Sequence, residues 1–489
     1  MDGRLAGLLV FVASGAVLVL EILAGRLLAP YVGVSLETFT GIIGVVLAGI
    51  SIGTWLGGRL ADRRDPRVLL PVALSLGGAA AIAAVPIIRA LGPSADGARP
   101  STIVVLAALA FFVPSALLSA VTPLVVKLQL RTVDHTGRVV GRLSALGTAG
   151  SLVGVFGTGF ILVAQFPTTP VVLGLGSALV LTGIGLWWAA AGGRAFGSTV
   201  AAGAIVAVLA AGTTVLAGDP CDVETAYFCA SVRHDPERPS GRVLVLDDLR
   251  HAYVDLDDPT YLDFAYVQLL GDVVNALDGQ GEPIDAVHVG GGGFTMPRYV
   301  EATRPGSDNV VFELDPGVVA IAEDELGLQL SPRLRVRTGD ARRHVSELPA
   351  ESADLVIGDA FGGRAVPWHL ATREFVGEIS DVLREEGVFA QNVIDQPPLR
   401  FLGAVVATLG RVFEHVAVIG PPERFDGTAG GNSIVIASDA PLPLERICAE
   451  IAARGDDDVI VSDDVALDEL IGDSPVLRDD YAPVDQLLT

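Results

Sequence analysis

The residues best suited to chemistry lie in the C-terminal half, at four consecutive glycines, Gly290, Gly291, Gly292 and Gly293. They follow the apolar residues 286–289, which predict a strand, and they precede residues that predict a helix. Glycine lets a backbone turn tightly and approach a ligand, and a helix N-terminus offers unpaired N–H groups at the positive end of its dipole. The pattern AVHVGGGGFT therefore predicts a ligand-binding turn, with a purely structural turn as the alternative.

Three carboxylates at the ends of the following predicted strands add a second feature. Glu313 ends a strand about twenty residues after the glycines, where a carboxylate accepts hydrogen bonds from ribose hydroxyls. Asp340 and Asp359 directly follow the next two predicted strands. Because parallel strands present their carboxyl ends at one edge of a sheet, we expect the three side chains at the ligand edge of an open α/β sheet.

The elements that position these residues alternate between strands and helices. The helical stretches run through Tyr299 and Leu326, which is typical of a parallel sheet with crossover helices. Predicted strands lie at residues 286–289, 310–313, 333–338, 355–358, 387–392 and 433–437, after β-rich segments at 225–232, 241–246 and 251–256. We expect a β-rich subdomain at 220–282, a Rossmann-like nucleotide-binding domain at 283–440 and an acidic, poorly patterned appendage at 441–489.

Residues 1–219 instead contain seven apolar runs, each long enough to cross the roughly 30 Å hydrocarbon core of a bilayer. Gly53 with Gly57, and Gly150 with Gly154, have the four-residue spacing that lets helix backbones approach closely. We therefore predict a transmembrane helical bundle. The runs lie at residues 5–29, 38–59, 68–91, 101–126, 141–164, 169–190 and 198–217.

Glu21 lies inside the first of these runs. An acid within a bilayer is costly and by default marks a functional site. The alternative is structural, namely an ion pair with Arg26 or a hydrogen bond inside the bundle.

The connections between the runs differ in how many basic residues they contain. The first and fifth connections have none, whereas the second and fourth carry Arg59, Arg63, Arg64, Arg67, Lys127, Arg131, Arg138 and Arg142. The positive-inside rule then places the N-terminus in the cytoplasm, and seven crossings place the C-terminal half outside. A cytoplasmic nucleotide is not supplied there, so either the count is wrong by one or the domain does not do what its fold suggests.

Cys221 and Cys229 form a bridge if the domain is outside the cytoplasm, and are otherwise two unpaired thiols, while Cys448 stands alone.

Charge is distributed unevenly along the chain. Residues 1–219 carry 8 of the 57 acidic and 13 of the 33 basic side chains, so the remainder carries 49 acids and 20 bases. A surface this negative argues against a nucleic-acid partner. Lys127 is the only lysine, and acid enrichment with almost no lysine indicates a halophile, with GC-rich coding as the alternative.

Residues 222–440 resemble the spermidine synthase family, including members fused to membrane helices. The resemblance rests on the LVLDD strand, the glycine turn, ELDPGVVAIA, the GDA turn, and VIGDAF followed by VPWHLATREF. The opening SGAVLVLEILAGRLLAP is similar to the membrane part of the fused members. The resemblance implies a Rossmann-like fold of the spermidine synthase and class I methyltransferase type. It also implies transfer of an aminopropyl group from decarboxylated S-adenosylmethionine to an amine such as putrescine, without a metal.

The same resemblance implies roles for the strand-end residues. Glu313 would hold the ribose, and Asp340 with Ala341 would lie beside the adenine. Asp359 would act as the general base that takes a proton from the attacking amine.

Departures from the family pattern affect the acceptor side. Gly293 stands where family members carry an aspartate that contacts the propylamine, and Gly362 stands at the second aspartate of their DxxD pattern. His251 falls on a family glutamine and is either a base in the acceptor pocket or a turn histidine. Tyr261 and Asp263 remain candidates for the acceptor side. Because a diamine carries two positive charges, losing two acids undermines putrescine chemistry and leaves nucleotide binding intact.

Three functions follow from these patterns. The first is a membrane-anchored aminopropyltransferase that acts on a small amine. The second is an S-adenosylmethionine-dependent methyltransferase, in which Gly293 tolerates the carboxylate end of the cofactor. The third is a transporter or sensor that binds a nucleotide or polyamine without turnover. In each case we expect a multi-pass protein of the cell membrane in contact with lipid, and a homodimer is one assembly that we consider.

Overall fold

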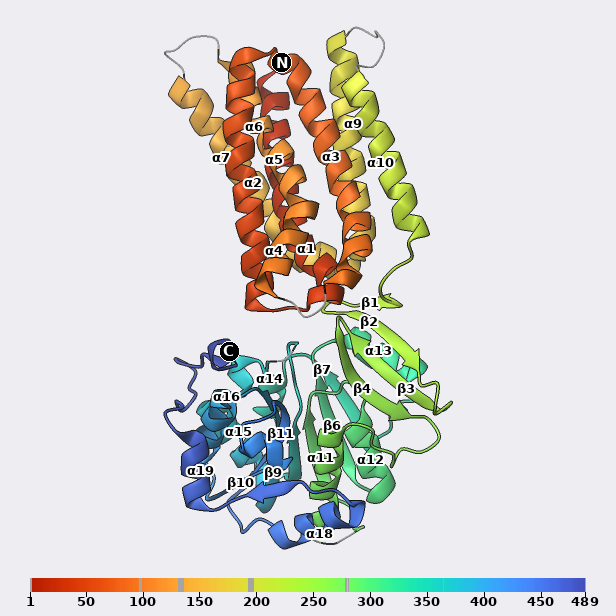
Figure 1. Cartoon of the computed structure of the whole chain (residues 1–489), viewed down its shortest axis with the longest axis vertical. Coiled ribbons are helices and arrows are strands. Elements are labelled where there is room, and N and C mark those ends of the chain that lie inside the picture. The colour runs from red at the N-terminus through yellow and green to blue at the C-terminus, as the bar shows by residue number, and fades with distance from the viewer. Residues whose placement is uncertain are drawn as a thin grey trace. The chain divides into compact units, whose positions relative to one another are not determined.

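The first unit of the structure is a bundle of long apolar helices (Figure 1). The computed structural model describes residues 2–95, 99–130, 136–191, 198–277, 279, 281–363 and 365–488. These divide into one compact unit of Met1–Ala230 with Leu246–Asp248, and a second of Ser231–Val245 with Leu249–Thr489.

Seven helices among the described residues of the first unit are long and apolar enough to cross a membrane, as the hydropathy predicts. Two of the seven are built from consecutive helical segments that include a π-helical stretch, η2 or η4. The segments are α1 (Gly3–Val32), α2 (Leu36–Arg63), α3 (Pro66–Leu91) with η1 (Gly92–Ser94), α4 (Pro100–Ala107) with η2 (Ala108–Phe112), α5 (Val113–Ser119) and α6 (Val121–Gln129), α7 (Thr136–Gly157) with η4 (Thr158–Leu162) and α8 (Val163–Gln165), α9 (Thr168–Ala191) and α10 (Ser198–Leu216).

Glycines set the close contact between α1 and α7. A Cβ atom on Gly154 would lie 2.6 Å from the Gly15 carbonyl oxygen, and one on Gly15 would lie 2.8 Å from the Gly150 carbonyl oxygen. On α2, a Cβ atom on Gly57 would lie 2.8 Å from the Cα atom of Ala120. The small-residue spacing therefore marks real backbone approaches in the bundle, as predicted.

Replacing Gly154 with leucine should destabilise the bundle. The side chain would force α1 and α7 apart, and overpacking of this kind costs about 1–3 kcal/mol or more of unfolding free energy. Gly157→Leu is the matched control, because it lies on the same helix and its Cβ atom meets no other atom within 4 Å. Thermal unfolding in detergent measures both. Equal melting temperatures for the two variants would contradict this account of the contact.

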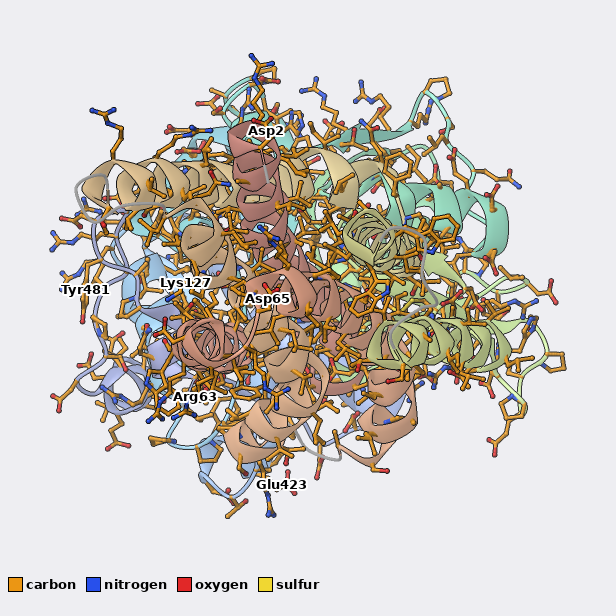
Figure 2. All side chains as sticks on the ribbon, turned by 90° about the horizontal axis from the view of Figure 1, so that it is seen from above. Asp2, Arg63, Asp65, Lys127, Glu423 and Tyr481 are labelled. Carbon is orange, nitrogen blue, oxygen red and sulfur yellow. A yellow bond between two sulfur atoms is a disulfide. The ribbon has the colours of Figure 1, made fainter. Side chains whose placement is uncertain are left out.

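Basic side chains at one end of the bundle contact neighbouring helices. At the end that holds the start of α1, Lys127 pairs with Asp62 at 2.7 Å, and Arg142 donates to the Gly3 carbonyl at 2.7 Å. Figure 2 looks onto this end, where Arg63 and Lys127 are marked. Because the described part of the bundle has seven long helices, an odd number, α10 ends at the opposite end.

A hairpin and a disulfide occupy that opposite end. The predicted single strand at 225–232 is wrong: β1 (Val223–Glu224) and β2 (Cys229–His234) are separate strands of a hairpin. The chain turns because the Thr225 hydroxyl accepts the N–H groups of Tyr227 and Phe228. Cys221 and Cys229 form a disulfide, so they are not unpaired thiols.

Glu224 of this hairpin binds the ends of two long helices. It accepts hydrogen bonds from Arg26 at 3.1 Å and from the backbone N–H of Thr168 at 2.7 Å. The pair between Glu21 and Arg26, one of the alternatives considered for Glu21, is not formed, because the Arg26 guanidinium points to Glu224 and to carbonyl oxygens of the hairpin.

The second unit contains a mixed sheet with strand order β12-β10-β11-β9-β8-β5-β6-β7. Strands β5 to β9 pair in parallel, as predicted from the alternation of strands and helices, and β10, β11 and β12 are antiparallel. A separate four-stranded sheet has the order β1-β2-β3-β4. The strands are β3 (Gly241–Leu246), β4 (Leu249–Asp255), β5 (Asp285–Val289), β6 (Asp308–Glu313), β7 (Leu334–Thr338), β8 (Ala353–Gly358), β9 (Leu383–Asp395), β10 (His415–Gly420), β11 (Gly431–Ser438) and β12 (Val459–Val461).

Helices cover both faces of the large sheet and form two cores. Along β8, Leu355 and Ile357 face one core and Val356 the other, because successive side chains of a strand point to opposite faces. The first core is covered by α11 (Ala265–Ala276), α12 (Thr295–Thr303) and α18 (Leu444–Arg454), and the second by α14 (Ala341–Val345), α15 (Arg373–Val382) and α16 (Arg400–Leu409). The helices α13 (Pro316–Glu325), α17 (Pro422–Phe425), α19 (Asp464–Ile471), α20 (Val484–Leu487) and η5 (Trp368–Leu370) complete the unit.

Residues 441–489, expected as an appendage, take part in this fold. Strand β12 pairs with β10, and Ile447 and Ile451 of α18 lie in the first core. Neither β10 nor β12 was predicted. Strand β10 lies within a longer apolar stretch of the sequence, which does not show where a strand begins. Strand β12 has only three residues.

Candidate functional site

The glycine turn leaves β5 and closes on two neighbouring strand ends. Gly290 and Gly292 have φ angles of +102° and +49°, which glycine adopts without strain. A Cβ atom on Gly290 would overlap the backbone carbonyl of Asp359. The turn therefore requires glycine both for its conformation and for its close approach to the end of β8.

Glu313, at the end of β6, binds the backbone of the glycine turn. Its Oε2 atom accepts the N–H groups of Gly291 and Gly292 at 2.9 and 3.1 Å, and its Oε1 atom accepts the N–H of Asp315 at 2.9 Å. Burial raises the pKa of Glu313, and these three hydrogen bonds act in the opposite direction. The carboxylate is thus joined directly to the predicted ligand-binding turn.

Asp359, which follows β8, is held by two neutral donors. Its Oδ1 atom accepts a hydrogen bond from the Asn392 amide at 2.8 Å, and its Oδ2 atom accepts one from the Tyr266 hydroxyl at 3.3 Å. Asn392 is in turn oriented by the Asn432 amide, which donates to its side-chain oxygen at 2.9 Å. Burial raises the pKa of Asp359 above the ordinary range, and the two hydrogen bonds lower it by less. The side chain is therefore a stronger base than an exposed aspartate once it is ionised.

His251 lies on β4 beside the glycine turn. A Cβ atom on Gly292 would meet its imidazole ring at 3.4 Å. Burial lowers the pKa of His251 to about 4, so the ring is neutral at neutral pH.

Tyr261 and Asp263 both contact arginine side chains. The Asp263 carboxylate pairs with Arg250 at 3.2 Å and accepts a long hydrogen bond of 3.5 Å from the Tyr261 hydroxyl. The guanidinium of Arg238 lies over the Tyr261 ring, 3.7 Å from its centre. Asp263 lines the cavity described below, whereas Tyr261 does not.

Asp340 caps α14, the helix that Ala341 begins. Its Oδ1 atom accepts the N–H of Arg343 at 3.3 Å, and its Oδ2 atom lies 2.9 Å from the Nε2 atom of His369. The His369 ring thereby joins η5 to the end of β7.

The departure at Gly293 has a steric reason. A Cβ atom at this position would lie 2.7 Å from the Cβ atom of Ala252 on β4. An aspartate could not be placed here unless β4 moved. At Gly362, by contrast, a Cβ atom would meet no other atom within 4 Å, so an acid there would be tolerated sterically.

A cavity of about 610 Å³ brings the central residues together. Of the predicted site residues, it is lined by Asp359, His251, Asp263 and the four glycines of the turn; Glu313, Asp340, Ala341 and Tyr261 lie outside its lining. Its size lies in the range of small-molecule pockets, about 300–1,000 Å³. The described residues contain no group of three or more His, Cys, Asp or Glu side chains able to hold a metal ion.

Several lining residues were missed by the sequence analysis. Asn392 ends a predicted strand, so the rule that located Asp359 could have found it. Four others carry no such signal, because they reach the cavity from two helices, an antiparallel strand and a connection: Tyr266, Arg424, Asn432 and Asp458.

Comparisons with known proteins match this half of the chain. A polyamine aminopropyltransferase of Vibrio vulnificus is 32% identical over 192 residues, which are 39% of this chain and 60% of that protein, less than two thirds of its length. An eEF1A lysine and N-terminal methyltransferase of Danio rerio is 26% identical over 130 residues, 25% of this chain and 19% of that protein. The crystal structure of a probable spermidine synthase from Corynebacterium glutamicum has a TM-score of 0.50 and 25% identity, covering 54% of this chain and 97% of that one. No family model matches the chain.

Proposed function

We propose that this chain, which belongs to a spermidine synthase-like family, is a transferase that moves an alkyl group from an adenosyl sulfonium nucleotide to an amine. The observation that carries the proposal is the position of Asp359. A carboxylate whose pKa is raised by burial stands at a strand end, next to the glycine turn that Glu313 supports.

The geometry supports a simple displacement. The glycine turn and Glu313 hold the ribose, and the amine nitrogen approaches Asp359. Asp359 takes a proton from the amine as its nitrogen forms a bond to the carbon attached to sulfur. The carbon–sulfur bond breaks, its electron pair stays on sulfur, and the products are a thioether nucleotide and an alkylated amine.

An aminopropyl group is the first candidate for the group transferred. The relatives that match the longest stretches of the chain, 192 and 213 residues, are named polyamine aminopropyltransferase. A methyl group is the second, because Gly293 leaves out the acid that would contact a propylamine. Incubating the purified full chain with decarboxylated or intact S-adenosylmethionine and a panel of amines tests both. Mass spectrometry of the thioether nucleotide identifies the donor, and absence of both thioethers would contradict the proposal.

Nucleotide binding should depend on Glu313. Glu313→Ala removes the ribose acceptor and the support of Gly291 and Gly292, and is expected to weaken binding of 5′-methylthioadenosine by about 1–3 kcal/mol. Glu313→Gln keeps one acceptor oxygen and should weaken binding less. Calorimetry on the full chain measures both, and an affinity of Glu313→Ala equal to wild type would reject this assignment.

We also propose that the bundle anchors the protein in a membrane. Besides their length, the helices carry many large apolar side chains on the outside of the bundle, such as Trp55, Phe160 and Leu209. Such side chains on one continuous surface are typical of contact with lipid.

A second candidate function is a membrane-bound receptor or transporter whose C-terminal half binds the nucleotide or a polyamine without turnover. The disulfide between Cys221 and Cys229 favours it, because such bonds rarely persist in a reducing cytoplasm. The seven long helices among the described residues favour it as well, because an odd number of crossings would place the C-terminal half outside the cytoplasm.

A further inference from the structure

Arg424 is a buried cation that the proposed mechanism does not use. It lies on α17, between β10 and β11, lines the cavity and is only 6% exposed. Its Nη2 atom donates to the Asn432 carbonyl at 3.3 Å, and its Nε and Nη1 atoms are buried without a partner. Buried polar groups in proteins are nearly always paired, and an unpaired buried charge is costly. The unpaired N–H groups on two guanidinium nitrogens therefore point to an anionic ligand.

The backbone is shaped for this guanidinium. A Cβ atom on Gly431 would lie 2.7 Å from Arg424 Nη2, and the φ angle of Gly431 is +136°, a conformation that favours glycine. Asp395, Asp458 and Glu423 are close enough to act on the charge of Arg424, but none of them forms an ion pair with it. The Asp395 carboxylate is already bound by the N–H groups of Gln396 and Leu402. Asp395 therefore does not satisfy the free donors.

The charges that line the cavity leave one carboxylate and one guanidinium without an ionic partner. Asp263 pairs with Arg250 at 3.2 Å. Asp458 pairs with Arg454 at 3.4 Å. Only Asp359 and Arg424 remain among the described lining residues.

These two groups are connected on one side of the cavity. Asp359 binds Asn392, Asn392 binds Asn432, and the carbonyl of Asn432 binds Arg424. A diamine would bring a second ammonium towards Arg424, which is unfavourable. A ligand with an amine at Asp359 and a carboxylate at Arg424 would satisfy both groups, since guanidinium binds carboxylate through parallel hydrogen bonds.

We propose that Arg424 binds a carboxylate carried by one of the two substrates. The first source of this carboxylate is an amino acid that serves as the amine acceptor. This rests on the proposed transferase function and specifies its substrate class. The carboxylate has a second source in the methionine part of S-adenosylmethionine. The experiment therefore has one arm for each.

The test uses the full chain in detergent and two matched pairs of ligands. In the first arm, with 5′-methylthioadenosine bound, calorimetry compares 4-aminobutanoate with 1,4-diaminobutane. In the second arm, it compares S-adenosylhomocysteine with 5′-methylthioadenosine. Arg424→Gln should weaken the carboxylate ligand of one arm by about tenfold or more, as expected for loss of charge-assisted hydrogen bonds. It should leave 5′-methylthioadenosine unchanged and should not weaken 1,4-diaminobutane, whose second ammonium no longer meets a like charge. The arm that responds identifies the source.

Two control variants distinguish recognition from folding. Arg424→Lys keeps the charge and should retain part of the affinity for the carboxylate. Arg411→Gln removes an exposed arginine outside the cavity and should leave all four affinities unchanged. If Arg424→Gln leaves both carboxylate ligands at wild-type affinity, the inference is overturned. If wild type binds neither nucleotide, the proposed function itself fails, and this inference fails with it.

Discussion

Turnover is expected to fall by roughly 10²–10⁴-fold when Asp359 is replaced by asparagine, because the variant cannot accept a proton from the attacking amine. Affinity for 5′-methylthioadenosine should stay close to wild type, since Glu313 and the glycine turn are untouched. Asp324→Asn, at an exposed position of α13, is the matched control and should keep full activity. If activity survives at Asp359→Asn, the base is another group, with His251 the next to test.

The pH profile gives this prediction a second readout. Burial raises the pKa of Asp359, and only the ionised form can act as a base, so activity should rise with pH. The midpoint of this rise should lie above the ordinary aspartate value of 3.8. The Tyr266 hydroxyl lowers the pKa of Asp359 by its hydrogen bond, so Tyr266→Phe should move the rise to still higher pH. An unchanged profile in this variant would contradict the assignment of Asp359.

Thiol labelling of intact cells is expected to reach Cys448 directly, and Cys221 and Cys229 only after reduction. Cys448 is exposed and free, and the other two form a disulfide. If the short basic connections lie in the cytoplasm, as the positive-inside rule predicts, and all seven long helices among the described residues cross the membrane, the three cysteines lie outside. A membrane-impermeant maleimide, before and after tris(2-carboxyethyl)phosphine, measures all three.

Cys448→Ser separates the two signals, because it should abolish labelling before reduction and leave the labelling after it. Label that enters only after lysis, without reductant, would contradict the topology and place the domain where the nucleotide is made. The expected result instead makes transfer depend on nucleotide supplied outside the cytoplasm. The activities of wild type and Asp359→Asn then decide between the transferase and the non-catalytic receptor.

The sequence by itself determined the helical bundle, the parallel part of the sheet and the edge that carries the site. Hydropathy is a property of consecutive residues, so the seven apolar runs correspond to the seven long helices. The end of a parallel strand is also a local feature, which is why Glu313 and Asp359 were placed correctly at one edge of the sheet.

Only the tertiary structure decided what each side chain does at that edge. The basicity of Asp359 depends on burial and on Tyr266, which lies 93 residues away in the chain. The sequence suggested Asp263 as an acceptor-side acid, but in the folded protein its carboxylate pairs with Arg250. Arg424 gave no signal in the sequence, because its importance comes from donors that the fold buries without a partner. Desolvation and ion pairing depend on neighbours that are distant in sequence, and a local pattern cannot reveal them.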